Sequence, residues 1–211
     1  MAGPITWDIL VHPFFSLGYV EMKPQRLLSP ELKRRLLANA NVLREIWGRR
    51  IRFLSSHPNR GLIILVPAFN QKLTALRGQN LPDHIKLAEE GERFCDELKS
   101  FAFKNLGHDR CAIAPPGIGI ELSLKTIAEA KGISAGISTG AVMGEYTDVC
   151  VKEAADYFSK LTGQKVRIAA RKGLNLMGAT RVRSAELARL HRTAFQRAER
   201  KANAKAKKAV R

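Results

Sequence analysis

Five short runs of apolar residues are spaced along the chain, and each of the first four is followed by a segment with a helical spacing of apolar positions. Short runs rich in Ile, Leu and Val are typical of strands that are buried on both faces of a parallel sheet. The clearest run, "GLIILVPAF", has no polar position at all. The pattern predicts five strands, over residues 5–11, 61–69, 110–115, 141–146 and 165–170.

The segments between these runs repeat apolar residues every three or four positions, which predicts amphipathic helices. In the first of them Ser29 has the residue type of an N-cap, Pro30 suits the first helical position and Gly48 is expected to end the helix. The polar stretch 70–83 is predicted to be a connection without a helix. The predicted helices cover 30–48, 82–106, the segment that ends at Gly132, the segment that ends at Gly163, and 183–200.

Strands and helices alternate, and right-handed crossovers turn that order into an open sheet covered on both faces. The sequence therefore predicts an α/β fold: a three-layer, doubly wound, mostly parallel five-stranded sheet of the Rossmann-like kind. We expect this domain to span residues 1–180, with a basic helical extension over 181–211. In such sheets ligands bind at the carboxyl ends of the strands. The strand exits to inspect are His12, Pro67–Asn70, Pro115–Gly119, Gly144–Cys150 and Arg171.

The charge of the chain is concentrated at its C-terminal end. The chain carries +17, and residues 181–211 hold eleven Lys and Arg against two Glu, a net charge of +9. Such a segment favours a polyanionic partner, because each phosphate contact releases counterions. We expect contact with RNA, DNA or a ribosome, and the alternatives are an anionic membrane surface or a solvated charged surface without a specific partner. The residues predicted to bind nucleic acid are Arg189, Arg192, Arg197, Arg200, Lys201 and Lys205; Arg49, Arg50, Arg52 and Arg60 form a second basic cluster.

Aromatic residues are almost absent from this C-terminal segment, so base stacking is not expected there and binding should be non-specific and sensitive to salt.

Three cysteines without a C-x-x-C pair favour neither a disulfide framework nor a zinc site, and they predict a reducing, cytoplasmic compartment. The five histidines have no metal-ligand spacing, so no metal and no cofactor is predicted. The longest apolar run is too short to cross a bilayer, and no membrane segment is expected. A homo-oligomer is left open.

Cys150 lies a few residues after the fourth predicted strand, in "GEYTDVCVKEAADYF", where Thr147 or Asp148 is expected to cap a helix. The first turn of a helix stabilises a thiolate, so Cys150 is a candidate nucleophile. The alternative is a small apolar residue at the start of a buried helix, because cysteine is among the most buried residue types.

The segment "GEYTDVCVKEAADYFSKLTGQKVRI" resembles the isochorismatase-like cysteine hydrolases, which carry a G-x-x-T-D-x-C-V motif between the fourth strand and its helix. The residues that match are Gly144, Thr147, Asp148, Cys150, Val151, Ala154, Ala155, Gly163 and Val166. The resemblance implies an α/β fold, a Cys150 nucleophile and a small amide or ester substrate. It is specific over about 25 residues and extends to the order of elements over residues 5–170.

Two further residues that this family uses are absent. Where it has an aspartate at the exit of the first strand, this chain has His12, and Asp8 lies earlier, inside the strand. Where it has a lysine after the third strand, this chain has "APPGIG". Imidazole beside a thiol can act as a general base, so His12 is the second candidate catalytic residue, with Glu145 or Asp148 as a substitute acid or base. The sequence therefore predicts a divergent or inactive hydrolase, or alternatively a non-enzymatic nucleic-acid- or ribosome-associated protein.

The glycines of "PPGIGIE" permit two interpretations. They could bring backbone N–H groups to a phosphate, or they could form a tight turn between strand and helix. Only two glycines are present, with no Gly-Lys-Ser/Thr ending, and the tight turn is the favoured interpretation.

Overall fold

The computed structural model describes residues 4–18, 28–137, 139–145 and 147–169, apart from the side chains of Thr147 and Asp148. The predicted helix 183–200, the predicted boundary at residue 180 and the six residues predicted to bind nucleic acid all lie outside this part of the chain.

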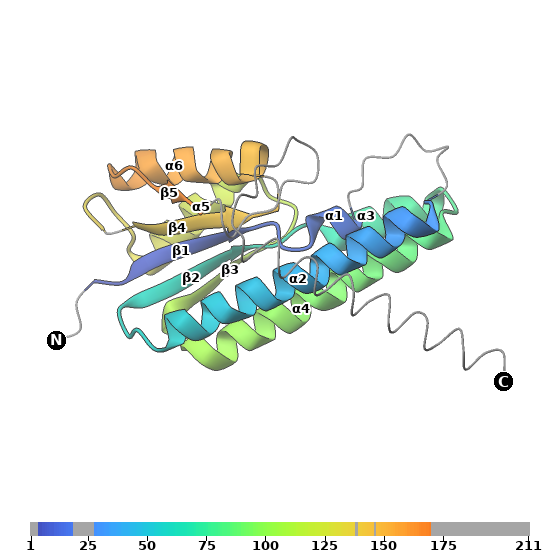
Figure 1. Ribbon diagram of the computed structural model, residues 1–211. Coiled ribbons are helices and arrows are strands. Elements are labelled where there is room, and N and C mark those ends of the chain that lie inside the picture. The colour runs from blue at the N-terminus through green and yellow to red at the C-terminus, as the bar shows by residue number, and fades with distance from the viewer. Residues whose placement is uncertain (1–3, 19–27, 138, 146, 170–211) are drawn as a thin grey trace.

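The centre of the molecule is a five-stranded sheet in which every strand pair is parallel. The strand order is β3-β2-β1-β4-β5, the arrangement of a doubly wound sheet. The α/β prediction is thus confirmed (Figure 1). The strands are β1 (Thr6–Val11), β2 (Arg60–Leu65), β3 (Cys111–Ala114), β4 (Thr139–Gly144) and β5 (Arg167–Ile168).

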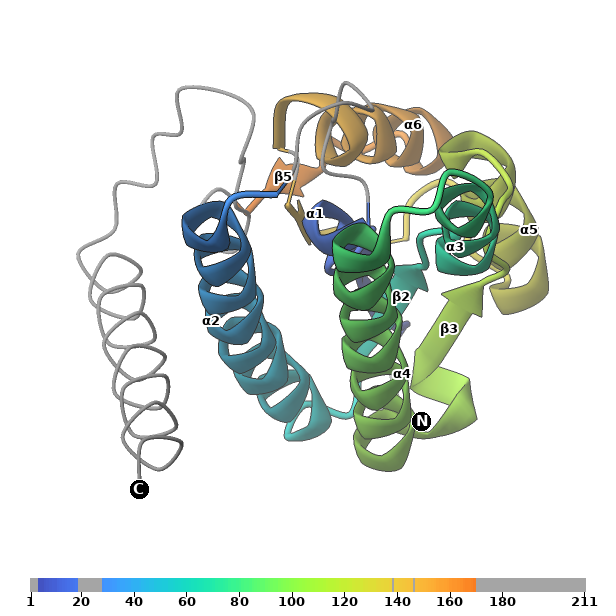
Figure 2. The same cartoon turned by 90° about the vertical axis from the view of Figure 1, so that its right-hand side faces the viewer.

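Helices cover both faces of the sheet, two long ones on one side and two shorter ones on the other (Figure 2). Alternation along the strands directs the side chains to two separate cores. Leu62 and Ile64 of β2 join the core under the long helices, whereas Ile63 and Leu65 join the core under the short helices. The long helices are α2 (Pro30–Ser55) and α4 (Pro82–Arg110), and the short ones are α5 (Ile120–Lys131) and α6 (Lys152–Thr162).

The start of α2 follows the sequence prediction, and its end does not. The Ser29 side chain accepts a hydrogen bond from the Leu32 N–H at 3.2 Å, as an N-cap should. The prediction that Gly48 ends the helix is wrong. Two further buried residues, Ile51 and Leu54, continue the apolar stripe and outweigh the cost of about 1 kcal/mol for a glycine inside a helix.

Both long helices extend beyond the carboxyl ends of the strands, as Figure 1 shows. The 26 residues of α2 span about 39 Å, whereas a six-residue strand spans about 20 Å. The short helices α1 (Phe15–Gly18) and α3 (Phe69–Gly78) pack against this projecting part.

The helix α3 lies in a stretch that the sequence analysis assigned to a polar connection, and that prediction is wrong. Its buried residues Phe69, Leu73 and Leu76 are spaced by four and three positions, which is a helical signal that its polar neighbours obscure. The ring of Phe69 packs between Gly18 and Gly91, where a Cβ atom on either glycine would approach it to 2.7 Å. This contact fixes α1 over the end of β1.

None of the helices in the described residues is both long enough and apolar enough to cross a membrane.

Candidate functional site at the carboxyl ends of β1 and β4

The strands β1 and β4 bring His12 and Glu145 to the same edge of the sheet. Val11 pairs with Gly144 in the parallel register, so the residues that follow them leave neighbouring strands at the same level. Gly144 is required at this point, because a Cβ atom there would collide with the Val11 carbonyl oxygen and with the Val151 side chain.

Glu145 is a buried carboxylic acid with one unpartnered oxygen. Its side chain is 1% exposed, and its Oε2 atom accepts a hydrogen bond of 2.6 Å from the backbone N–H of Ser16 in α1. Its Oε1 atom has no hydrogen-bond partner among the described residues. Burial raises the pKa of Glu145 to about 7, and the hydrogen bonding from Ser16 opposes that rise. Near neutral pH this group can therefore both accept and donate a proton.

His12 is a neutral imidazole at the end of β1. Burial lowers its pKa to about 4, so the ring is uncharged at neutral pH. It stacks on Phe15 with 5.5 Å between ring centroids, and its backbone φ of 47° is unusual for a residue other than glycine. The Nδ1 atom is buried and has no partner in the part of the chain that the structure describes.

Ser16 lies against the Glu145 carboxylate through two groups. It is 1% exposed, its backbone N–H binds Glu145, and its hydroxyl also lowers the pKa of Glu145, although within the described ranges the Oγ atom makes no hydrogen bond of standard geometry. Buried polar atoms almost always have a partner, so the incompletely satisfied atoms of His12, Ser16 and Glu145 make this sheet edge a candidate site for a ligand or a water molecule. Sequence reasoning missed Ser16, because a serine inside "HPFFSLG" has no pattern that separates it from an ordinary turn residue.

Cys150 lies directly before α6, near the predicted start of that helix, and capping by Thr147 or Asp148 stays a prediction because their side chains lie outside the described part of the chain. Cys150 belongs to a single turn of π-helix, Thr147–Val151, and α6 begins after it at Lys152. Burial raises the pKa of its thiol, the Glu153 carboxylate raises it further, and a hydrogen bond from the backbone N–H of Cys150 opposes the rise. A raised pKa favours the thiol over the thiolate, which is the stronger nucleophile.

Cys150 and Glu145 also belong to different faces of the sheet. Cys150 packs against the core under α5 and α6, together with Val151 and Phe158. Glu145 binds α1, whose Leu17 lies in the core under the long helices. The expected pairing of His12 with Cys150 is not among the contacts that the structure records for either residue.

Asp8, the only carboxylate in β1, is part of the core. It is fully buried, its Oδ2 atom accepts a hydrogen bond from Arg50 Nε at 2.5 Å, and its Oδ1 atom accepts one from the Ala141 N–H at 3.1 Å. Gly140 makes room for it, because a Cβ atom there would clash with Oδ1. Asp8 lies in the first half of the strand, and it is held away from the carboxyl edge.

The loop after β3 supports the tight-turn interpretation. Gly117 has a φ of 87°, which favours glycine, and a Cβ atom on it would approach the Gln71 side-chain nitrogen to 2.5 Å. The loop therefore packs against α3 through Gln71.

No group of His, Cys, Asp and Glu residues that could hold a metal ion occurs in the described ranges.

The chain matches no family model, no curated protein and no solved structure. The resemblance to isochorismatase-like hydrolases therefore stays a prediction, based on the motif around Cys150 and the order of elements.

Proposed function

We propose that the protein is a divergent isochorismatase-like hydrolase of a small amide or ester, in which Glu145 is the acid–base group. The observation that carries this proposal is a fully buried carboxyl group at the carboxyl end of the sheet, with a pKa of about 7 and one oxygen that has no hydrogen-bond partner among the described residues. Strongly shifted pKa values in such positions are typical of catalytic acids and bases.

The chemistry requires a proton acceptor that later becomes a proton donor. Ionised Glu145 takes a proton from a water molecule as the water oxygen attacks the substrate carbonyl carbon. The resulting carboxylic acid returns that proton to the leaving nitrogen or oxygen as the bond to the carbonyl carbon breaks. Neutral His12 and the Ser16 hydroxyl can each donate a hydrogen bond to the carbonyl oxygen, on which negative charge develops.

Cys150 is not required by this proposal, because it packs against the core under α5 and α6 and burial raises the pKa of its thiol. The measurement is hydrolysis of p-nitrophenyl acetate and of a panel of small primary amides by the purified chain. Glu145→Gln should lower the rate at least about 100-fold, the usual contribution of a general base. Cys150→Ser, the matched control, should keep most of the activity.

Labelling with iodoacetamide gives a readout that is independent of substrate. Cys150 should react no faster than an ordinary free thiol, because burial and Glu153 hold its pKa above the usual value. Fast labelling at pH 7, together with loss of hydrolysis in Cys150→Ser, would contradict the proposal and restore Cys150 as the nucleophile.

A second candidate function is association with nucleic acid through the C-terminal segment. Residues 170–211 contain thirteen Lys and Arg and only two Glu, whereas many arginines of the described part are paired with carboxylates. The test replaces Arg189, Arg192, Arg197, Arg200, Lys201 and Lys205 by Gln in the full chain. RNA binding should weaken. The slope of the logarithm of the binding constant against the logarithm of salt concentration should become shallower by up to about 4. Unchanged binding would contradict this candidate.

A further inference from the structure

The largest exposed aromatic side chain in the described residues lies far from the candidate active site. Phe53, in the last turns of α2, is 41% exposed. It lies close to the start of β2, at the amino-terminal edge of the sheet, opposite the edge that holds His12 and Glu145.

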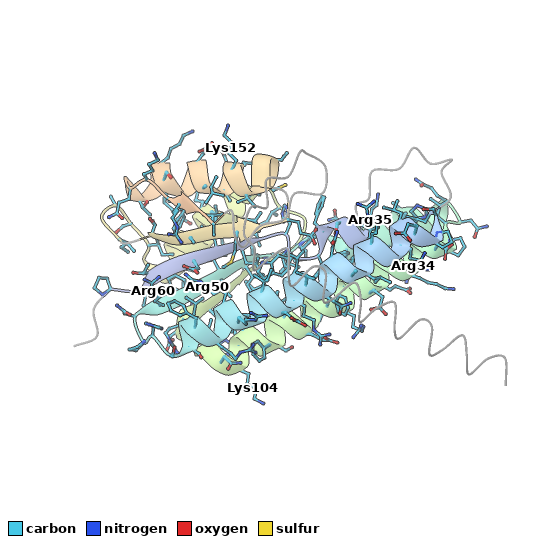
Figure 3. The ribbon with its side chains drawn as sticks, viewed as in Figure 1. Arg34, Arg35, Arg50, Arg60, Lys104 and Lys152 are labelled. Atoms are coloured by element: carbon cyan, nitrogen blue, oxygen red, sulfur yellow. The ribbon has the colours of Figure 1, made fainter. Side chains whose placement is uncertain are left out.

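Positively charged and aromatic groups surround the Phe53 ring. The guanidinium carbon of Arg50 is 4.7 Å from the ring centroid, and that of Arg60 is 5.9 Å from it. The imidazole of His57 lies 4.3 Å from the Phe53 ring, and its Nδ1–H donates a hydrogen bond of 2.7 Å to the Phe53 carbonyl oxygen. We refer to Phe53, His57 and Arg60 as the Phe53 platform. Figure 3 shows Arg60 close to Arg50, with Arg34 and Arg35 at the other end of α2.

The two guanidinium groups near Phe53 have different roles. Arg50 is partly buried and holds Asp8, so its charge is compensated inside the protein. Arg60 has no carboxylate partner in the described ranges, and neither has the exposed Arg52. Arg52 lies one residue before Phe53, and its guanidinium lies over the ring of Phe101. The platform therefore combines an exposed ring with uncompensated positive charge.

We propose that the Phe53 platform binds single-stranded nucleic acid, with a base packed against the exposed part of the Phe53 ring and phosphates contacted by Arg60 and Arg52. Single-strand sites combine an aromatic surface with a positively charged track, because every base has a π-face and every linkage a phosphate. The bases of a duplex are stacked internally, and they cannot use an isolated phenyl ring in this way.

This inference does not depend on hydrolysis, and it is separate from the basic C-terminal segment. That segment supplies charge with almost no aromatic residues, whereas the platform supplies the aromatic ring. A preference for single strands over duplexes is what the platform adds to non-specific electrostatic attraction.

The test measures fluorescence anisotropy of labelled 12-nucleotide RNA, single-stranded and as a duplex, with the full-length chain. Phe53→Ala should weaken single-strand binding about tenfold, the usual size of one base-stacking contact, and should leave duplex binding almost unchanged. Phe53→Trp should retain or improve single-strand binding. Thermal midpoints of the variants verify that each one folds.

Arginine variants separate the platform from general charge. Arg60→Gln should weaken single-strand binding. It should also make the slope of log binding constant against log salt concentration shallower by about 0.7, which corresponds to the loss of one phosphate contact. Arg35→Gln is the matched control, because Arg35 is exposed, also lacks a carboxylate partner in the described residues, and lies at the opposite end of α2.

The same variants in the background with six Gln residues in the C-terminal segment distinguish the two nucleic-acid hypotheses. A Phe53→Ala effect that persists there supports the platform, even if the C-terminal segment proves to bind nothing. Equal single-strand affinities of the wild-type, Phe53→Ala and Phe53→Trp chains would overturn the platform, and so would an equal loss for single strands and duplexes.

Discussion

Two buried carboxylates, Asp8 in the first half of β1 and Glu145 after β4, have the same low exposure and opposite environments. Asp8 faces the guanidinium of Arg50 and a backbone N–H. Glu145 has one backbone N–H and an oxygen without a partner in the described residues. A buried charge is stable only when it is paired. Asp8 has the guanidinium of Arg50 as its partner, whereas burial without a cation among the described residues drives Glu145 toward its neutral form. Burial alone therefore does not distinguish these two carboxylates; the presence or absence of a neighbouring cation among the described residues does.

The largest expected effect is the loss of stability when Asp8 is replaced. Asp8→Asn leaves the mostly buried Arg50 without its counter-charge and should lower the free energy of unfolding by about 3–5 kcal/mol. Urea denaturation monitored by circular dichroism measures this loss.

The control is the double variant Asp8→Asn/Arg50→Met. It removes the unpaired charge of Arg50 and should recover most of the lost stability. If the double variant is less stable than Asp8→Asn alone, the ion pair is not the cause of the loss.

The second effect is the pH dependence of stability that Glu145 contributes. Its pKa rises from 4.5 to about 7 on folding, so between these values the folded chain holds a proton that the unfolded chain has lost. Stability should therefore fall as pH rises through this window, by about 3 kcal/mol in total. Glu145→Gln should remove the fall, so the variant should match the wild type near pH 4 and exceed it near pH 8. Parallel stability curves for the two chains would contradict the assigned pKa.

The smallest of the three effects has the opposite sign and belongs to His12. Its pKa falls from 6.5 to about 4 on folding, so the unfolded chain gains a proton first as pH falls. Stability should decrease from pH 6.5 toward pH 4, by about 2 kcal/mol after allowance for partial exposure. His12→Asn keeps a residue that tolerates the positive φ and should lack this decrease. NMR titration of the His12 ring in the wild type checks the same point, and an ordinary pKa there would refute it.

Several elements of the fold could be predicted from local pattern because a local cause determines them. The start of α2 depends on Ser29 and Pro30, and the strand β2 on an unbroken apolar run. The end of α2 and the presence of α3 could not be predicted in this way. Ile51 is helical because it packs into the core, and Phe69 because two glycines on other elements leave space for its ring.

The candidate site likewise has features that follow from local sequence and features that depend on tertiary contacts. The sequence alone determined the parallel α/β order, the strand exits that hold His12, Glu145 and Cys150, and the concentration of charge after residue 180. Only the tertiary structure decided that Glu145 faces Ser16 while Cys150 faces the opposite core, and that Arg50 belongs to Asp8 rather than to the surface. The reason is physical: proton affinity and charge compensation depend on the groups that lie within a few ångströms, and Ser16 and Glu145 are 129 positions apart in the chain.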